Sequence, residues 1–399
     1  MATATARRSR VPVWLSAGAP LVLIAMLVGV FLALDPIGEL RAVPPVENLV
    51  VERTVFDEGR IELVVRNDGP DPVTVAQVLV DDAYRNFSIG DQTLDRLGTT
   101  SIDLAYPWDE GQPIAFTLIT STGATIEHDV DVAALTPRAD ANTLGIYALL
   151  GLYIGVIPIL VGLLWFPALR GASRRWLGFF LAFTIGLLVF LLVDTIAEGL
   201  ELAAETAGSL SGTSLFAIGA IGAVLGLLTL QTVLDRRTPD RGKSGSARAA
   251  LGLAYMIAAG IGLHNMGEGL AVGAALAAGE VGLGTTLVLG FALHNTTEGL
   301  AIVAPLGADQ KRPALWHFAL LGAVAGIPTI AGAWAGGFVF SPAWATLAFG
   351  IAAGAIAQVV WAIGRSMSGN RAGGLTTPLG ATGLFAGLLV MYVTGLFAV

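Results

Sequence analysis

The chain has 399 residues, of which 54% are hydrophobic and only 13% are charged, and its mean hydropathy is +0.73. Soluble globular proteins carry about 25% charged residues, so this composition excludes an ordinary soluble protein and predicts an α-helical polytopic membrane protein. The net charge of −8 argues against nucleic-acid binding, and the absence of cysteine excludes disulfides, zinc–thiolate sites and cysteine nucleophiles, which leaves nitrogen and oxygen to hold any metal.

The first uncharged stretch runs from Val11 to Leu34 and follows three basic residues, Arg7, Arg8 and Arg10. The apolar core of a signal peptide usually has about 7 to 15 residues, and this stretch is longer. We therefore predict that residues 1–42 form a cytoplasmic tip and an uncleaved signal-anchor helix. A cleaved signal peptide, cut near the sequence FLALDP, is the alternative.

Residues 43–140 are polar and contain short alternating or β-branched runs that are separated by turn sequences. The runs include RIELVV, SIDLAY, IAFTLITST and ATIEHDVDVA, with NDGP, EG and TG as turns. This spacing predicts an extracytoplasmic, immunoglobulin-like antiparallel β-sandwich. The single histidine of this segment, His128, is predicted to be a solvated strand residue rather than a metal ligand.

Residues 141–399 contain seven further apolar runs, from which we predict eight helices that cross the membrane. About 20 helical residues cross the ~30 Å of hydrocarbon in a bilayer. The run from Pro313 to Gly364 is too long for one helix, and we predict that it folds back near Ser341-Pro342. The other six predicted spans are Thr143–Leu169, Trp176–Ala203, Ser211–Leu234, Ala249–Gly279, Val281–Ala308 and Leu375–Val399.

Basic residues occur only in alternate short loops between these spans. By the positive-inside rule these loops and the N-terminus are cytoplasmic, whereas residues 43–140 and the C-terminus are extracytoplasmic. We therefore predict a multi-pass protein of the plasma membrane. The basic residues of the loops are Arg170, Arg174 and Arg175; Arg236, Arg237, Arg241, Lys243 and Arg248; Lys311 and Arg312; and Arg365 and Arg371.

Two adjacent spans carry the same string, H-N-x-x-E-G-L-A, at an offset of 30 residues and near the centre of each span. Histidine and glutamate four residues apart share one helix face, so antiparallel neighbours bring both pairs together. Two imidazoles and two carboxylates suit a divalent first-row metal, and amide oxygens can join them. The alternative is that these polar residues only hydrogen-bond the helices to each other. The predicted ligands are His264, Asn265, Glu268, His294, Asn295 and Glu298.

A second polar cluster lies at the external end of the span Trp176–Ala203, where Asp194, Glu198 and Glu201 share a helix face. An acidic face can concentrate cations, so we predict that it forms the external access path for a metal. A solvated helix end is the alternative, above all for Glu201.

Two more polar residues are candidates for the metal path. His317 begins a later span and is either a packed histidine, the favoured interpretation, or an exit ligand. Gln358 either offers an amide oxygen to the path or forms a hydrogen bond between helices. Pro158 and Pro328 free backbone carbonyls within two spans, which requires other groups to satisfy them.

The paired motifs, on the fourth and fifth helices of an eight-helix unit, resemble those of the ZIP family of divalent metal transporters. The resemblance covers residues 142–399 and implies an inverted 3+2+3 arrangement of helices with both ends outside, which agrees with the topology from Lys and Arg. It also implies a first metal site at His264, Glu268, His294 and Glu298, and a second position at Asn265 and Asn295 that shares a glutamate.

The chain departs from the family pattern at several positions. Gly267 and Thr297 stand where the family often has proline, which implies a softer helix kink. Thr329 stands where the family often has a glutamate of the second site, which puts a second metal in doubt. Asp194 and Glu198 keep an acidic version of a family His-Pro-Glu spacing, and the cytoplasmic loop at residues 235–248 lacks histidines.

These observations predict a membrane transporter, not an enzyme, that carries divalent transition metals toward the cytoplasm. Zinc is the favoured substrate, with iron, manganese, cobalt and cadmium as alternatives, because His/Glu sites accept several ions. The predicted partners are metal ions and membrane lipid, with a second copy of the chain as a candidate and no nucleic acid. The rival functions are a membrane-embedded metal-dependent hydrolase and a surface receptor whose sandwich binds a ligand.

Overall fold

The structure is a computed structural model, and it describes residues 13–34, 46–237, 243–308, 312–368 and 374–396. The chain divides into two compact units, Met1–Val46 and Glu47–Val399. Within the first unit, α1 (Val13–Leu34) is a helix of 22 residues, and its apolar stretch Gly18–Phe31 is exposed. The N-terminal arginines and the loop residues Arg241, Lys311 and Arg371 lie outside the described part of the chain.

The predicted β-rich segment forms two antiparallel sheets that share one hydrophobic core. Inward residues alternate along each strand; in β2, for example, Ile61, Leu63 and Val65 are buried while their neighbours are partly exposed. One sheet has the strand order β1-β2-β7-β5, and the other has the order β4-β3-β8-β9 with β6 paired to β3. The strands are β1 (Leu49–Asp57), β2 (Arg60–Asn67), β3 (Val73–Val80), β4 (Ala83–Arg85), β5 (Phe87–Ile89), β6 (Thr93–Leu94), β7 (Thr99–Ala105), β8 (Ile114–Thr120) and β9 (Thr125–Val130).

The histidine of this segment is less solvated than the sequence suggests. His128 lies on β9, half-buried, where its Nε2 is 3.0 Å from the hydroxyl of Thr54 on β1 and its ring stacks on Phe116. Burial lowers the pKa of His128. His128 is thus on a strand, as predicted, but the prediction that it is solvated was wrong, because the contact with Thr54 between β1 and β9 shields one side of the ring.

Eight helical segments of the described chain are long and apolar enough to cross a membrane, and they coincide with the eight spans predicted after residue 140. The predicted fold-back at Ser341-Pro342 is the boundary between two of them. The elements are α2 (Ala141–Gly151), the π-helical turn η2 (Leu152–Val156), α3 (Ile157–Leu163), α4 (Phe166–Arg170), α5 (Arg174–Glu205), η3 (Gly208–Leu210), α6 (Gly212–Arg237), α7 (Lys243–Ala277), α8 (Val281–Val303), η4 (Ala304–Ala308), α9 (Leu315–Phe338), α10 (Pro342–Ser368) and α11 (Pro378–Gly395).

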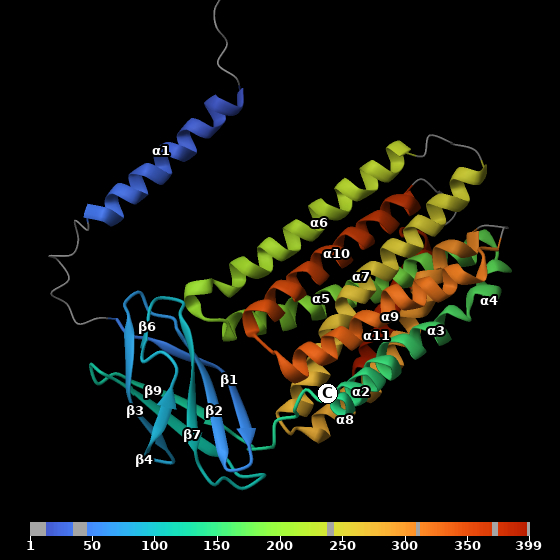
Figure 1. Ribbon diagram of the computed structural model, residues 1–399. Helices are drawn as coiled ribbons and strands as arrows, with labels where there is room; N and C mark the ends of the chain where they lie inside the picture. The colour runs from blue at the N-terminus through green and yellow to red at the C-terminus, as the bar shows by residue number, and fades with distance from the viewer. Residues whose placement is uncertain (1–12, 35–45, 238–242, 309–311, 369–373, 397–399) are drawn as a thin grey trace, which may run out of the picture. The chain divides into compact units, whose positions relative to one another are not determined.

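The helices run alongside one another, with α7 against α9, α10 against both α5 and α6, α11 against α5, and α3 against α8 (Figure 1). The two motif helices, α7 and α8, also contact each other. Where each meets an outer helix, a glycine is required: a Cβ on Gly332 of α9 would clash with the carbonyl oxygen of Met266, and one on Gly162 of α3 would clash with that of Thr296. Backbones in van der Waals contact hold both motifs at fixed depth and rotation.

Candidate metal site

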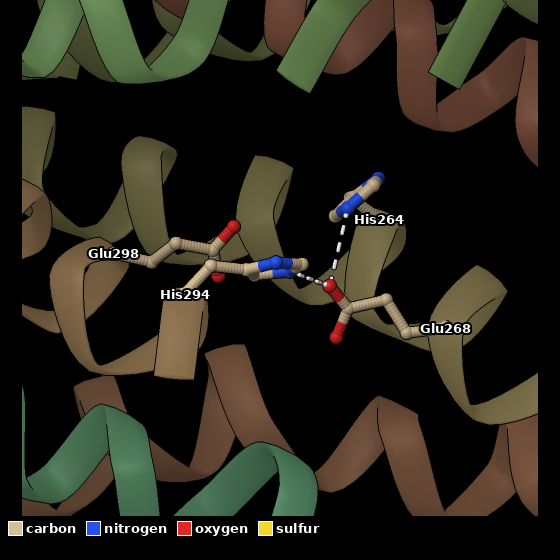
Figure 2. Close-up of side chains that lie close together, drawn as sticks. All are labelled: His264, Glu268, His294 and Glu298. Carbon is tan, nitrogen blue, oxygen red and sulfur yellow. Dashed lines mark hydrogen bonds and ion pairs between the residues drawn. The ribbon is translucent and has the colours of Figure 1, made fainter. Parts of the chain in front are cut away.

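Four side chains of the repeated motif meet between α7 and α8. His264, Glu268, His294 and Glu298 are each at least 95% buried, and one ligand atom of each lies within 4.8 Å of the others. Figure 2 shows His264 and His294 directed at the same oxygen of Glu268. The structure therefore brings together the four residues that the sequence predicted as the first metal site.

Glu268 is at the centre of the cluster. Its Oε1 is in close contact with His294 Nε2 and lies 3.3 Å from His264 Nε2, while its Oε2 accepts a hydrogen bond of 2.7 Å from Asn295 Nδ2. A carboxylate with this many nitrogen neighbours is held in one orientation. Glu298 differs, because neither of its oxygens has a hydrogen-bond partner of good geometry, although Asn265 lies beside it.

The two motif asparagines are anchored to outer helices through their amide NH2 groups. Asn295 Nδ2 donates to the carbonyl oxygen of Ile154 at 3.0 Å, and Asn265 Nδ2 donates to that of Ala325 at 3.1 Å. Carbonyl and carboxylate oxygens only accept hydrogen bonds, so these contacts fix which end of each amide faces them. The amide oxygens of both asparagines are consequently left without a partner.

A proline explains why the carbonyl of Ile154 is free. In an α-helix that carbonyl would accept from the backbone N–H four residues later, which is position 158, and Pro158 has none. The chain passes through the π-helical turn η2 just before this proline, and Asn295 supplies the missing donor. This confirms the expectation that a carbonyl freed by Pro158 is satisfied by another group.

Five buried side-chain oxygens near the motifs have no hydrogen-bond partner in the described part of the chain. Buried polar atoms are nearly always paired, and an exception calls for an explanation such as an ion that would bind there. Thr329, whose hydroxyl packs tightly against Gly155 of η2, supplies one of them. The five are Asn265 Oδ1, Asn295 Oδ1, Glu298 Oε1, Glu298 Oε2 and Thr329 Oγ1.

Sequence reasoning missed one residue that contacts the site. Thr195 of α5 is fully buried, and its Oγ1 lies 2.9 Å from His264 Nδ1. The available signal was a hydroxyl residue directly after Asp194 in an apolar run, but the helix-face argument singled out only the acids. Which helix face meets α7 depends on packing between segments 69 residues apart, which periodicity alone does not give.

The predicted access residues lie on α5 beside Thr195 and outside the four-residue cluster. Asp194 and Glu201 are exposed, and Glu198 is partly buried and close enough to Glu268 for their charges to interact. Glu198 thus links the acidic face to the cluster. The exposure of Glu201 also fits its alternative interpretation as part of a solvated helix end.

The two remaining candidates are engaged with protein groups. His317 Nδ1 lies 2.9 Å from the hydroxyl of Tyr255, and its ring stacks on Trp316, as expected for a packed histidine. Gln358 is buried and donates to Gln231 of α6 at 3.4 Å, a contact between α10 and α6. Neither belongs to the cluster of metal-ligand type.

The cluster has the chemistry of a divalent-metal site. In the tetrahedral geometry that zinc prefers, ligands at about 2.0–2.2 Å from the ion lie ~3.3–3.6 Å from one another, so this cluster, whose ligand atoms lie within 4.8 Å of one another, closes around one ion with side-chain movements of about an ångström. Two buried carboxylates also provide the charge that balances a divalent cation.

Comparison with known proteins does not identify a family or a function for this chain. No protein-family model matches this sequence, and no curated protein matches it.

Proposed function

We propose that the chain is a membrane transporter of divalent transition-metal cations, of the ZIP type, with zinc as the favoured substrate and the cytoplasm as its destination. The observation that carries the proposal is the buried cluster of two histidines and two glutamates in the middle of two apolar helices. His294 is the middle residue of the 27-residue candidate span Val281–Gly307, and His264 lies within two residues of the middle of the 30-residue span Arg248–Ala277.

Charge at this depth favours transport over a structural role. Ionisable side chains cost several kcal/mol at the centre of a bilayer and typically mark ion pathways. Within the described chain, no Lys or Arg forms an ion pair with Glu268 or Glu298, and the only side chains of basic type in contact with Glu268 are the two histidines. A divalent cation that binds all four side chains would offset both negative charges.

The donor set favours borderline transition metals over hard cations. Imidazole nitrogen suits zinc, iron, cobalt and nickel, whereas calcium and magnesium prefer oxygen ligands alone. The unpaired amide oxygens of Asn265 and Asn295 lie next to the cluster and can add weaker oxygen ligands. Because Thr329 brings a neutral hydroxyl in place of a carboxylate, we propose one principal metal position rather than two.

The proposed route begins at the acidic face of α5. Asp194 and Glu201 are exposed there, and Glu198 continues the negative charge toward Glu268. Cations attracted to this face would reach the four-residue cluster and leave on the opposite side by alternating access. The backbones of α7 and α9, and those of α8 and α3, pack closely together. We therefore expect each of these two helix pairs to move as a rigid body during such a change.

The test is uptake of labelled zinc into proteoliposomes that contain the full chain. Glu268→Ala and Glu298→Ala should each abolish uptake above the background of empty vesicles, because each removes a charged ligand. Glu280→Ala is the matched control, since Glu280 is an exposed carboxylate at the start of α8, outside the cluster, and its variant should keep the wild-type rate. Wild-type uptake in both cluster variants would contradict the site assignment.

Competition experiments identify the substrate class. Excess cadmium, cobalt, iron or manganese should reduce zinc uptake, whereas excess calcium or magnesium should leave it unchanged, because a site with two imidazoles disfavours hard cations. Competition by magnesium equal to that by cadmium would argue against coordination by His264 and His294.

A further inference from the structure

We propose that Thr195 is a positioning residue that fixes the imidazole of His264 in the tautomer protonated at Nδ1, so that Nε2 is free to bind metal. The tautomer of His264 can be measured in the metal-free protein. The expected effect of this tautomer on metal affinity rests on the function proposed above. Thr195 lies on α5 and His264 on α7, so the contact joins a motif helix to the helix of the acidic face.

The position of one proton decides the tautomer. Thr195 Oγ1 lies 2.7 Å from the carbonyl oxygen of Leu191, one helical turn earlier. Two oxygens this close share a proton, and a carbonyl has none, so the threonine hydroxyl donates to Leu191. A hydroxyl has a single proton, so the contact of 2.9 Å with His264 Nδ1 needs its proton from the histidine. His264 therefore carries its proton on Nδ1.

The other ring nitrogen then faces the metal site with a lone pair. His264 Nε2 lies 3.3 Å from Glu268 Oε1, which is also an acceptor, and Figure 2 shows the ring edge directed at that oxygen. Two unprotonated acceptors at this separation repel each other, so the contact needs a proton or a metal ion between them, and a bound metal would take that place. Support of a metal-binding histidine by a hydrogen bond to its second nitrogen is a general feature of metal sites.

The second histidine of the cluster has no equivalent support. Among the described residues, His294 Nδ1 has no hydrogen-bond partner, and the His294 ring contacts Phe291 instead. The two motif histidines thus differ, because only His264 has a hydrogen-bond partner at Nδ1. We therefore expect a threonine hydroxyl to determine the tautomer of His264 but not that of His294.

Three variants isolate the hydroxyl. Thr195→Val keeps the shape of the side chain and removes the hydroxyl, and Thr195→Ser restores the hydroxyl without the methyl group. Thr184→Val is the matched control: Thr184 is on the same helix, is fully buried, and donates to the carbonyl of Phe180 one turn earlier at 2.9 Å, but has no hydrogen bond to a histidine among the described residues.

The first measurement is ¹⁵N NMR of the metal-free full chain with ¹⁵N-labelled imidazoles, with His264→Asn used to assign the signals of His264. Wild type, Thr195→Ser and Thr184→Val should show a protonated Nδ1 and an unprotonated Nε2. Thr195→Val should show a mixture of both tautomers. The same single tautomer in Thr195→Val, or an Nε2-protonated His264 in the wild type, would overturn the proposal.

The second measurement is zinc affinity by titration calorimetry of the same proteins. Loss of a group that supports a metal ligand typically weakens binding by about 10- to 100-fold, so Thr195→Val should fall in that range, with Thr195→Ser and Thr184→Val close to wild type. Absence of zinc binding in the wild type would contradict the proposed function but leave the NMR result to decide the tautomer. Wild-type zinc affinity in Thr195→Val together with a changed tautomer would overturn the link to metal binding.

Discussion

Glu268 and Glu298 occupy the same place in the two motifs but differ in their surroundings. Glu268 contacts two histidines and Asn295, whereas Glu298 has both oxygens buried without a hydrogen bond of good geometry. A buried polar group without a partner costs about 1–3 kcal/mol of stability. Glu298 therefore destabilises the metal-free protein, as expected for a residue kept for binding rather than folding.

This asymmetry predicts opposite effects of one substitution. Glu298→Met should leave the melting temperature of the metal-free protein unchanged or raise it, because an apolar side chain of similar length replaces an unpaired carboxyl. Zinc affinity should fall by more than the about 10- to 100-fold that follows loss of a supporting group, since a ligand itself is lost. Thermal unfolding in detergent and zinc titration measure the two effects.

The control is Leu300→Met, a substitution of similar volume at a buried position on the same helix, which should change neither quantity much. A large drop in the melting temperature of metal-free Glu298→Met would show instead that Glu298 stabilises the fold. The unpaired oxygens of Glu298 would then no longer support a role as metal ligands.

At the scale of elements, the interruption of the helix at η2 determines how Asn295 is held. Pro158→Ala would restore a backbone N–H that competes with Asn295 for the carbonyl of Ile154. We expect a small gain in stability, because the restored N–H adds a backbone hydrogen bond where η2 meets α3, although proline in the first turn of a helix costs little by itself. We also expect zinc affinity to fall by about tenfold as the amide of Asn295 loses an anchor. Thermal unfolding and zinc titration test both effects.

Pro328 in α9 gives the matched comparison. Pro328→Ala would restore an N–H for the carbonyl of Val324, whereas Asn265 donates to the next carbonyl, that of Ala325. It should therefore stabilise the protein without weakening zinc binding. Equal losses of affinity in the two proline variants would show that a general change in helix shape, and not the Ile154–Asn295 hydrogen bond, controls the site.

The sequence was sufficient for features that depend on local pattern. Apolar runs predicted the eight helices after residue 140, and the repeated motif predicted the four residues that meet at the cluster. It was insufficient where rotation of one helix against another decides the contacts. Thr195 reaches His264, and Glu268 rather than Glu298 becomes the hydrogen-bonded centre, because of how the outer helices pack on α7 and α8. His128 was misjudged because its partner Thr54 is on another strand, 74 residues away in the sequence.

At the scale of the larger unit, the loop after β2 binds the connection between α5 and α6. The carboxylate of Asp68 accepts hydrogen bonds from the backbone N–H groups of Gly208 and Ser209, at 2.9 and 2.7 Å, and from the hydroxyl of Ser209. Burial alone would raise the pKa of Asp68, but the hydrogen bonds from Ser209 and Gly208 outweigh it and hold the pKa below its usual value.

A lowered folded-state pKa means that ionised Asp68 stabilises this contact above the unfolded pKa, about 3.9, and that the stabilisation is lost as the pH falls through the folded value. Hydrogen exchange at the amides of Gly208 and Ser209, expressed relative to intrinsic rates, should therefore show protection at pH 7 that disappears in strong acid. Asp68→Ala should lose this protection at pH 7, whereas Asp91→Ala, which removes an exposed carboxylate elsewhere on the sandwich, should keep it. Full protection in Asp68→Ala would mean that packing of η3 by itself, without the carboxylate, orders the connection between α5 and α6.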